Sequence, residues 1–131
     1  ETIPGIDIVR IDAALSFVNS QHVKRLLGDR AAQLQTEPRA LVLDCSGIND
    51  IDATGAETLA EILTDLDESP VVLHLCDVKG PVRDVLRRAG LWERLDGRLH
   101  ATAHQAVELI TGSAEPAPGD RRAAGLEESG V

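Results

Sequence analysis

The sequence has 131 residues, a formal net charge of −9 and an aliphatic composition, with 43% hydrophobic residues but only 2% aromatic ones. A length of this order accommodates one domain with a core of its own. The negative charge argues against a nucleic-acid-binding protein, because no basic surface is available to neutralise phosphates. No apolar run approaches the roughly 20 residues that a membrane helix needs, so the segment is expected to be soluble by itself.

Two features concern the cellular context of the chain. It has two cysteines and no signal-like start, which favours a reducing compartment over a disulfide framework. It also opens on Glu1 rather than on a methionine, and this start favours a piece of a longer polypeptide.

The beginning of the chain predicts two short strands followed by a helix. Isoleucines alternating with charged residues over residues 6–11 indicate a half-buried strand, and residues 15–18 indicate a second strand. Phe17 in the second run is expected to anchor the aliphatic core. Asn19 is a favourable N-cap for the helix, which must end before Pro38 because proline disfavours helical geometry in the preceding residue.

The middle of the chain predicts a strand, a turn and an amphipathic helix. Residues 40–43 are an apolar run that is too short for a helix and typical of a strand buried on both faces. The helix that follows has an apolar inner face and an acidic outer face. The expected inward residues are Leu59, Ile62, Leu63 and Leu66, and the expected outward residues are Glu57, Glu61 and Asp65.

The last part of the chain predicts a strand over residues 71–76 and two further helices. Pro81 suits the first position of a helix with a basic outer face, and Gly90 ends that helix. Leu99 starts a short strand, and Thr102 caps a final helix. The basic face comprises Arg83, Arg87 and Arg88, and the inward residues of the final helix are Ala106, Val107, Leu109 and Ile110.

These elements together predict an α/β domain over residues 1–112. Parallel strands must be joined by crossovers, so we expect a mixed sheet of about four to five strands packed against about four to five helices. Residues 113–131 show no hydrophobic period and are rich in proline, glycine, alanine and charge. We expect them to form a disordered C-terminal tail.

Two stretches resemble one known family. Residues 10–19, RIDAALSFVN, are similar to the entry motif of the STAS domain carried by SulP-type sulfate and anion transporters. In that motif an Arg precedes an apolar strand with a Phe, and an Asn opens a helix. Residues 43–48 and 52–55 resemble the central STAS signature, which is shared with bacterial anti-sigma factor antagonists. The resemblance extends from about Pro4 to Ile110.

The resemblance implies a STAS fold and a non-catalytic module. In the transporter branch this is a regulatory domain at the cytoplasmic face of the plasma membrane, behind a membrane-spanning domain that transports sulfate or another anion. The implied partners are that membrane-spanning domain of the same chain and regulatory proteins, with no nucleic acid. The resemblance implies a guanine or adenine nucleotide as a ligand and implies no cofactor. The alternative is a free-standing protein like the anti-sigma factor antagonists, which acts as a phospho-switch.

The start of the central helix is the leading candidate site. Thr54 and Glu57 form a Thr-x-x-Glu capping box, with Asp52 as a rival N-cap, and capping by itself accounts for Thr54. The unpaired N–H groups of a helix start also suit a phosphate or another anion. The resemblance to the antagonists places the phosphorylated hydroxyl at Thr54. The antagonists carry Ser there, usually after another Ser, whereas here Ala53 precedes Thr54.

A second group of candidates follows the ends of two strands. Ser46, Lys79 and Gly80 lie past carboxyl ends of neighbouring strands, where ligands bind in open α/β sheets. Lys79 can approach a phosphate as a point charge, although the chain has no glycine-rich phosphate motif and a solvated loop lysine is the simpler account. The full candidate set for an anion or nucleotide is Ser46, Asp52, Thr54, Gly55, Lys79 and Gly80.

Two further patterns are weak indications of chemistry. Residues 50–54 match Asp-x-Asp-x-Thr, but the nucleophile of such a phosphotransferase directly follows a buried strand, which here ends at Asp44. His100 and His104 are spaced for one helix face without an accompanying cysteine or carboxylate pattern, so no metal site is expected. We therefore expect no enzymatic activity.

The remaining polar residues are interpreted as packing or surface residues. His74 is expected to pack within its strand. Cys45 and Cys76 end two strands, and two small buried thiols near each other are ordinary packing rather than a redox pair. The acidic and basic helix faces are solvated, or they are docking surfaces if the domain is regulatory. The sequence leaves this choice open.

Overall fold

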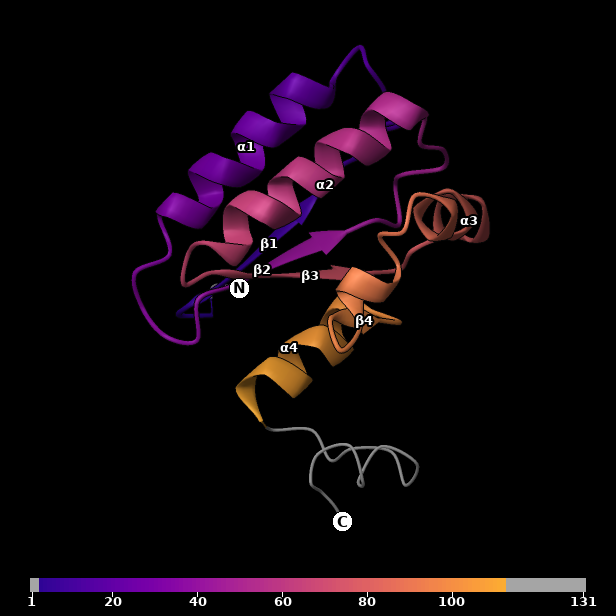
Figure 1. Ribbon diagram of the computed structural model, residues 1–131. Helices are drawn as coiled ribbons and strands as arrows, with labels where there is room; N and C mark the ends of the chain where they lie inside the picture. Colours follow the sequence, from indigo (N-terminus) through magenta and orange to yellow (C-terminus); the bar gives the residue numbers. More distant parts are fainter. Residues whose placement is uncertain (1–2, 113–131) are drawn as a thin grey trace.

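The computed structural model describes residues 3–112 and consists of one sheet with helices on both faces (Figure 1). The strands are β1 Ile6–Arg10, β2 Ala40–Asp44, β3 Val72–Cys76 and β4 Leu99–His100. The helices are α1 Ser20–Ala32, α2 Ala53–Asp67, α3 Gly80–Arg88 and α4 Ala103–Thr111, with a short 3-10 helix at Glu93–Leu95. The α/β fold class is therefore confirmed. None of the helices within residues 3–112 is long and apolar enough to cross a membrane.

The four strands follow one another in chain order across the sheet, and every neighbouring pair is parallel. The sheet is therefore parallel throughout, whereas a mixed sheet was expected. Among residues 3–112, antiparallel pairing is limited to an isolated bridge between Ile3 and Ile6. The physical reason is that a helix-containing crossover joins each strand to the next, and such a connection returns the chain in the same direction. Ile8, Val42 and His74 share one row of the register.

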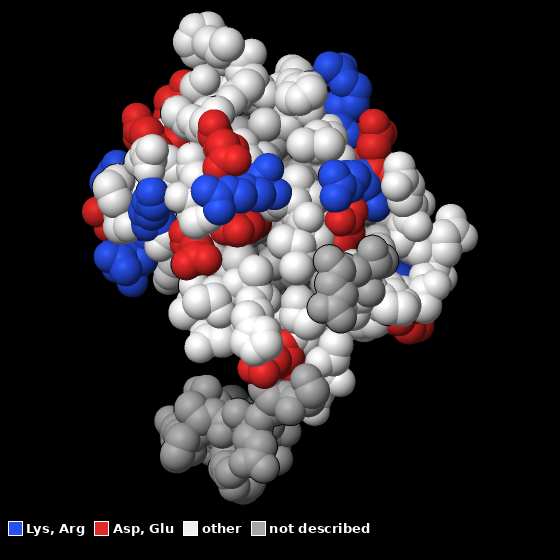
Figure 2. Space-filling model, turned by 180° about the vertical axis from the view of Figure 1, so that it is seen from behind, with Lys and Arg blue, Asp and Glu red and all other residues white. Residues whose placement is uncertain are grey.

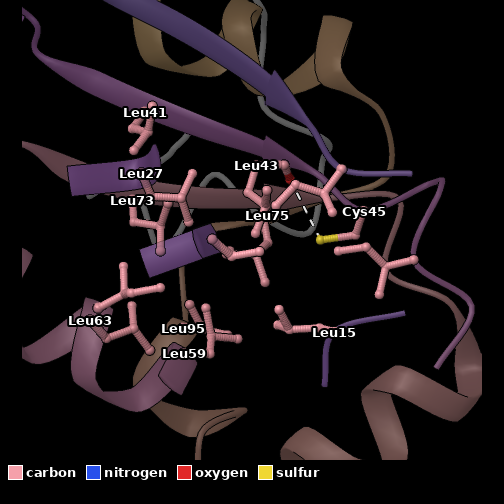
Figure 3. Packing of buried hydrophobic residues seen from close by; sticks show 14 of the residues in the cluster. Leu15, Leu27, Leu41, Leu43, Cys45, Leu59, Leu63, Leu73, Leu75 and Leu95 are labelled. Carbon is pink, nitrogen blue, oxygen red and sulfur yellow. Dashed lines mark hydrogen bonds between the residues drawn. The ribbon is translucent and has the colours of Figure 1, made fainter. Parts of the chain in front are cut away.

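The main core lies between the sheet and helices α1 and α2. Side chains alternate across the strands, so Leu41 and Leu43 of β2 face the same side as Leu73 and Leu75 of β3. Leu63 of α2 meets this side, and Figure 3 shows the leucines gathered there. The opposite face carries a smaller cluster that α4 covers. That cluster contains Ile6, Ala40, Val42, Cys76 and Ala106.

The expected second strand over residues 15–18 does not form. Leu15 is buried and makes an isolated parallel bridge to Ile51. The chain then turns. Asn19 occupies the N-cap position of α1 as predicted, but its side chain accepts a hydrogen bond from the Ser16 amide at 3.0 Å and makes none to the helix. As a result Phe17 is 71% exposed, so the prediction that it anchors the core is wrong.

The predicted start of the final helix is confirmed, whereas its predicted inner face is only partly correct. The Thr102 hydroxyl accepts a hydrogen bond from the Gln105 amide at 3.1 Å and caps α4 as predicted. Ala106 is buried, whereas Leu109 was expected inward and is 48% exposed. Residues 113–131, the expected tail, lie outside the described residues.

Candidate functional site

The start of α2 is organised by one carboxylate, that of Asp52. Its Oδ1 accepts a hydrogen bond from the Gly55 amide at 2.7 Å, which makes Asp52 the N-cap of the helix. Its Oδ2 accepts a second bond from the Phe17 amide at 3.2 Å. Asp52 therefore caps α2 and also ties the turn after Leu15 to the helix start. Of the two N-caps considered from the sequence, the structure uses Asp52.

Thr54 lies one residue inside α2 and is exposed. The predicted capping box between Thr54 and Glu57 is therefore wrong, because a residue with helical neighbours on both sides cannot occupy the cap position. Gly55 is required for packing: a Cβ atom there would overlap the carbonyl oxygen of Leu15. The helix start thus presents an exposed Thr54 beside the Asp52 cap.

The residues predicted past the ends of β2 and β3 lie beside a separate cavity of about 430 Å³. Ser46 and Lys79 line it, and the Lys79 Nζ atom lies 2.5 Å from Asn49 Oδ1. Gly80 is the first residue of α3, directly after Lys79. The rest of the lining comprises Asp77, Val78, Trp92, Leu99, His100 and Ala101. Asp52, Thr54 and Gly55 do not line this cavity, so the predicted set divides into two places.

Sequence reasoning missed a pair of histidines next to this cavity. His100 lies in β4 rather than on a helix with His104, and its Nε2 is 3.0 Å from Nδ1 of His74. Burial, with the nearby His100 and Arg98, lowers the pKa of His74 to about 4, and burial also lowers the pKa of His100. Both rings are therefore neutral near pH 7. The short strand expected from Leu99 is confirmed as β4, but the pairing of His100 with His74 depends on how β4 lies against β3, for which the sequence carries no local signal.

The sheet edge also carries a group of potential metal ligands, Asp44, Cys76 and Asp77. Their ligand atoms lie within 4.8 Å of one another. Burial raises the pKa of the Cys76 thiol to about 12, which keeps the thiol protonated near pH 7. Asp44 accepts a hydrogen bond from the Ser46 amide. The Cys45 amide donates to the Cys76 carbonyl at 2.9 Å, which confirms that the two cysteines are neighbours.

The surface offers three features on which a protein could dock. Phe17 and Val18 are 71% and 79% exposed beside the start of α2. The acidic residues predicted on the outer face of α2 and the basic residues predicted on α3 are exposed as expected. On the face seen in Figure 2, acidic and basic side chains lie beside one another, without a continuous basic area.

The chain matches known proteins over most of its length. The STAS domain family model matches residues 1–106. The chain is 31% identical over 116 residues to the high affinity sulfate transporter 2 of Stylosanthes hamata, which covers 82% of the chain but only 18% of the transporter.

Two solved structures show the same fold. One is a sulfate transporter family protein from Wolinella succinogenes, with a TM-score of 0.72, 23% identity, and 86% of this chain and 91% of that one covered. The other is the anti-sigma factor antagonist SpoIIAA in its unphosphorylated form, with a TM-score of 0.68, 14% identity, and 88% and 96% covered. The family match, supported by this agreement in fold, establishes that the chain belongs to the STAS domain family.

Proposed function

We propose that this chain is the cytoplasmic regulatory domain of a SulP-type sulfate transporter. The observation that carries the proposal is the match to a sulfate transporter in which the chain corresponds to only 18% of the length. Most of that protein therefore lies outside the match, and the transport chemistry belongs to its membrane-spanning part. The domain itself is non-catalytic in this proposal and acts through contacts with the transport domain and with regulatory proteins.

The exposed turn at Phe17 and Val18 is the surface best suited to such contacts. Its amide groups are already bonded within the domain, to Asp52 and to the Ser16 hydroxyl, so a partner need not order the turn on binding. Phe17 and Val18 are neighbours in the chain and 71% and 79% exposed, so they place two adjacent apolar side chains at the surface of this turn.

The test of the proposal is fractionation of the native cells, with detection of the endogenous polypeptide that contains this segment. We expect a band several times larger than the 131-residue chain, and we expect it to pellet with the membranes. A soluble band of the size of the segment alone would overturn the transporter assignment.

The second candidate function is a free-standing phospho-switch with Thr54 as the modified residue. It is favoured by the exposure of the Thr54 hydroxyl at a helix start and by the fold shared with SpoIIAA. A phosphate there would be attracted by the α2 dipole but repelled by Asp52, whose carboxylate ties down the Phe17 turn. Modification would then loosen the turn and change the docking surface.

Mass spectrometry of the native protein tests this second function. A phosphate found on Thr54, together with altered partner capture by the Thr54→Asp variant, would support it. An unmodified Thr54 in cells sampled across growth conditions, together with unchanged capture by Thr54→Asp, would remove it.

We also propose a guanine or adenine nucleotide as a regulatory ligand. Support comes from the cavity shared by Ser46 and Lys79, which combines a hydroxyl and a cation at the carboxyl edge of the sheet. Equilibrium dialysis of the purified chain against GTP and ATP tests this point. Absence of saturable binding of either nucleotide would remove the ligand and leave the transporter assignment unaffected.

A further inference from the structure

A second cavity, the Arg39 cavity, lies at the end of the sheet where β2 and β3 begin. Arg39 directly precedes β2 and Val71 directly precedes β3, and both residues line the cavity. Helices α1 and α2 lie side by side, and both finish at this end of the sheet (Figure 1). The volume of about 430 Å³ falls within the roughly 300–1,000 Å³ that is typical of small-molecule sites. The Arg39 cavity is therefore separate from the Ser46 and Lys79 cavity at the opposite sheet edge.

The wall that α1 contributes is kept open by a glycine. Gly28 lies in the interior of α1, where glycine is less favourable than alanine. Outside the neighbouring turns of α1, no described atom lies within 4 Å of the position that a Cβ atom would take there. Gly28 shares one helix face with Ala31 and Ala32, which follow it by three and four residues and also line the cavity. A longer side chain at Gly28 would fill this space.

Arg39 is the only lysine or arginine among the lining residues. Its Nε atom is buried and has no hydrogen-bond partner within residues 3–112. The carboxylate of Glu37, a side chain that is 81% exposed, lies 3.6 Å from Nε and is too distant for a hydrogen bond. One terminal nitrogen of Arg39 donates to the Gln35 carbonyl oxygen at 3.2 Å. Because a buried N–H group without an acceptor is unfavourable, an anionic ligand would gain a charge-assisted hydrogen bond here.

The other polar groups of the wall limit the ligand to one negative charge. The Ser69 hydroxyl is already engaged, since it donates to the Leu66 carbonyl oxygen at 2.9 Å and accepts from the Val71 amide at 3.1 Å. Asp65 adds a carboxylate to the wall, and the C-terminal ends of α1 and α2 carry partial negative charge. A second anionic group, away from Arg39, would therefore be repelled.

We propose that the Arg39 cavity binds an aliphatic monocarboxylate. Its carboxylate pairs with the Arg39 guanidinium in place of the Glu37 carboxylate. Its chain lies against the apolar part of the wall, where each buried methylene adds to the affinity. This apolar part comprises Ala31, Leu34, Leu66 and Val71. The site is independent of the start of α2, of the proposed nucleotide and of the transporter assignment.

Amide NMR spectra of the purified 131-residue chain test the inference, with sodium hexanoate as the ligand. Hexanoate should shift the amide signals of Gly28, Ala31 and Val71 saturably, with half-saturation at about 1 mM or below. Three related compounds separate the parts of the interaction. Hexanamide lacks the charge, acetate lacks the chain, and hexanedioate adds a second charge. Each should bind about tenfold more weakly than hexanoate.

Variants of the chain locate the site. Arg39→Gln should weaken hexanoate binding about tenfold or more, whereas Arg25→Gln, at an exposed position of α1 outside the cavity, should not. Gly28→Leu should abolish binding by filling the cavity, and it should fold well because leucine is favoured over glycine in helices. Glu37→Gln should tighten binding about twofold or more, since the competing carboxylate is lost. Glu57→Gln makes the same charge change outside the cavity and is its control.

Four results would overturn the inference. The first is an absence of saturable shifts with hexanoate up to about 20 mM. The second is equal affinity in Arg39→Gln and Arg25→Gln, and the third is hexanoate binding that persists in Gly28→Leu. The fourth is a set of shifts confined to the Ser46 and Lys79 cavity. If Arg39→Gln proves unfolded by its amide spectrum, Gly28→Leu decides by itself.

Discussion

The buried histidine pair predicts that the domain loses stability on mild acidification. His74 is only 9% exposed and shares a hydrogen bond with His100, and the pKa of His74 is lowered to about 4 from an unfolded value of 6.5. A histidine whose folded pKa is depressed takes up its proton more readily in the unfolded chain. Stability is therefore unaffected by His74 above pH 6.5 and falls as the pH drops from 6.5 toward 4.

The magnitude follows from the width of that window. Between pH 7 and pH 5 the unfolded chain gains most of a proton at His74, whereas the folded chain gains little. At about 1.36 kcal/mol per pH unit, the free energy of unfolding should fall by about 2 kcal/mol over this range through His74 alone. Few carboxylates with ordinary pKa values change their charge there, so the effect can be separated from general acid denaturation.

The measurement is urea denaturation at pH 7 and pH 5, followed by Trp92 fluorescence, for the wild type and His74→Asn. Asparagine keeps a polar atom near the place of His74 Nδ1 but does not titrate. The variant should lose about 2 kcal/mol less than the wild type between the two pH values. His22→Asn, an identical change at an exposed position of α1, is the control and should behave as the wild type. Equal losses in the wild type and His74→Asn would refute the reasoning.

Three further predictions concern stability. Asp52→Ala should lower the free energy of unfolding by about 1–2 kcal/mol, because the α2 cap and the tie to Phe17 are both lost. Thr54→Ala, its control in chemical denaturation, should change it by less than about 0.5 kcal/mol, and a larger cost would mean that Thr54 caps the helix after all. Phe17→Ser should leave the thermal midpoint nearly unchanged, since the side chain is 71% exposed, and a clear drop would show that it packs. Leu63→Ala, fully buried, should cost about 3 kcal/mol in urea denaturation, with exposed Leu109→Ala as the control that costs far less.

The helices and the two central strands could be predicted from the sequence because their signals are local. The spacing of apolar residues in α2, the Thr102 cap of α4 and the apolar runs of β2 and β3 each operate within a few residues. Ser46 and Lys79 were also predicted to follow neighbouring strands, and both line the cavity. That agreement rests on a general property of parallel sheets, in which strand ends meet at one edge.

The sequence by itself determined an acidic, aliphatic α/β domain and marked the start of its central helix as a candidate anion site. Only the tertiary structure decided that Phe17 faces solvent, that Asp52 rather than Thr54 caps α2, and that His100 pairs with His74. The first and the last of these outcomes depend on contacts between segments far apart in the chain: 35 residues separate Phe17 from Asp52, and 26 separate His74 from His100. The Asp52 cap is a local bond to the Gly55 amide, and Asp52 also accepts the bond from Phe17. A local pattern carries no information about such contacts, because they arise only when the sheet brings the segments together.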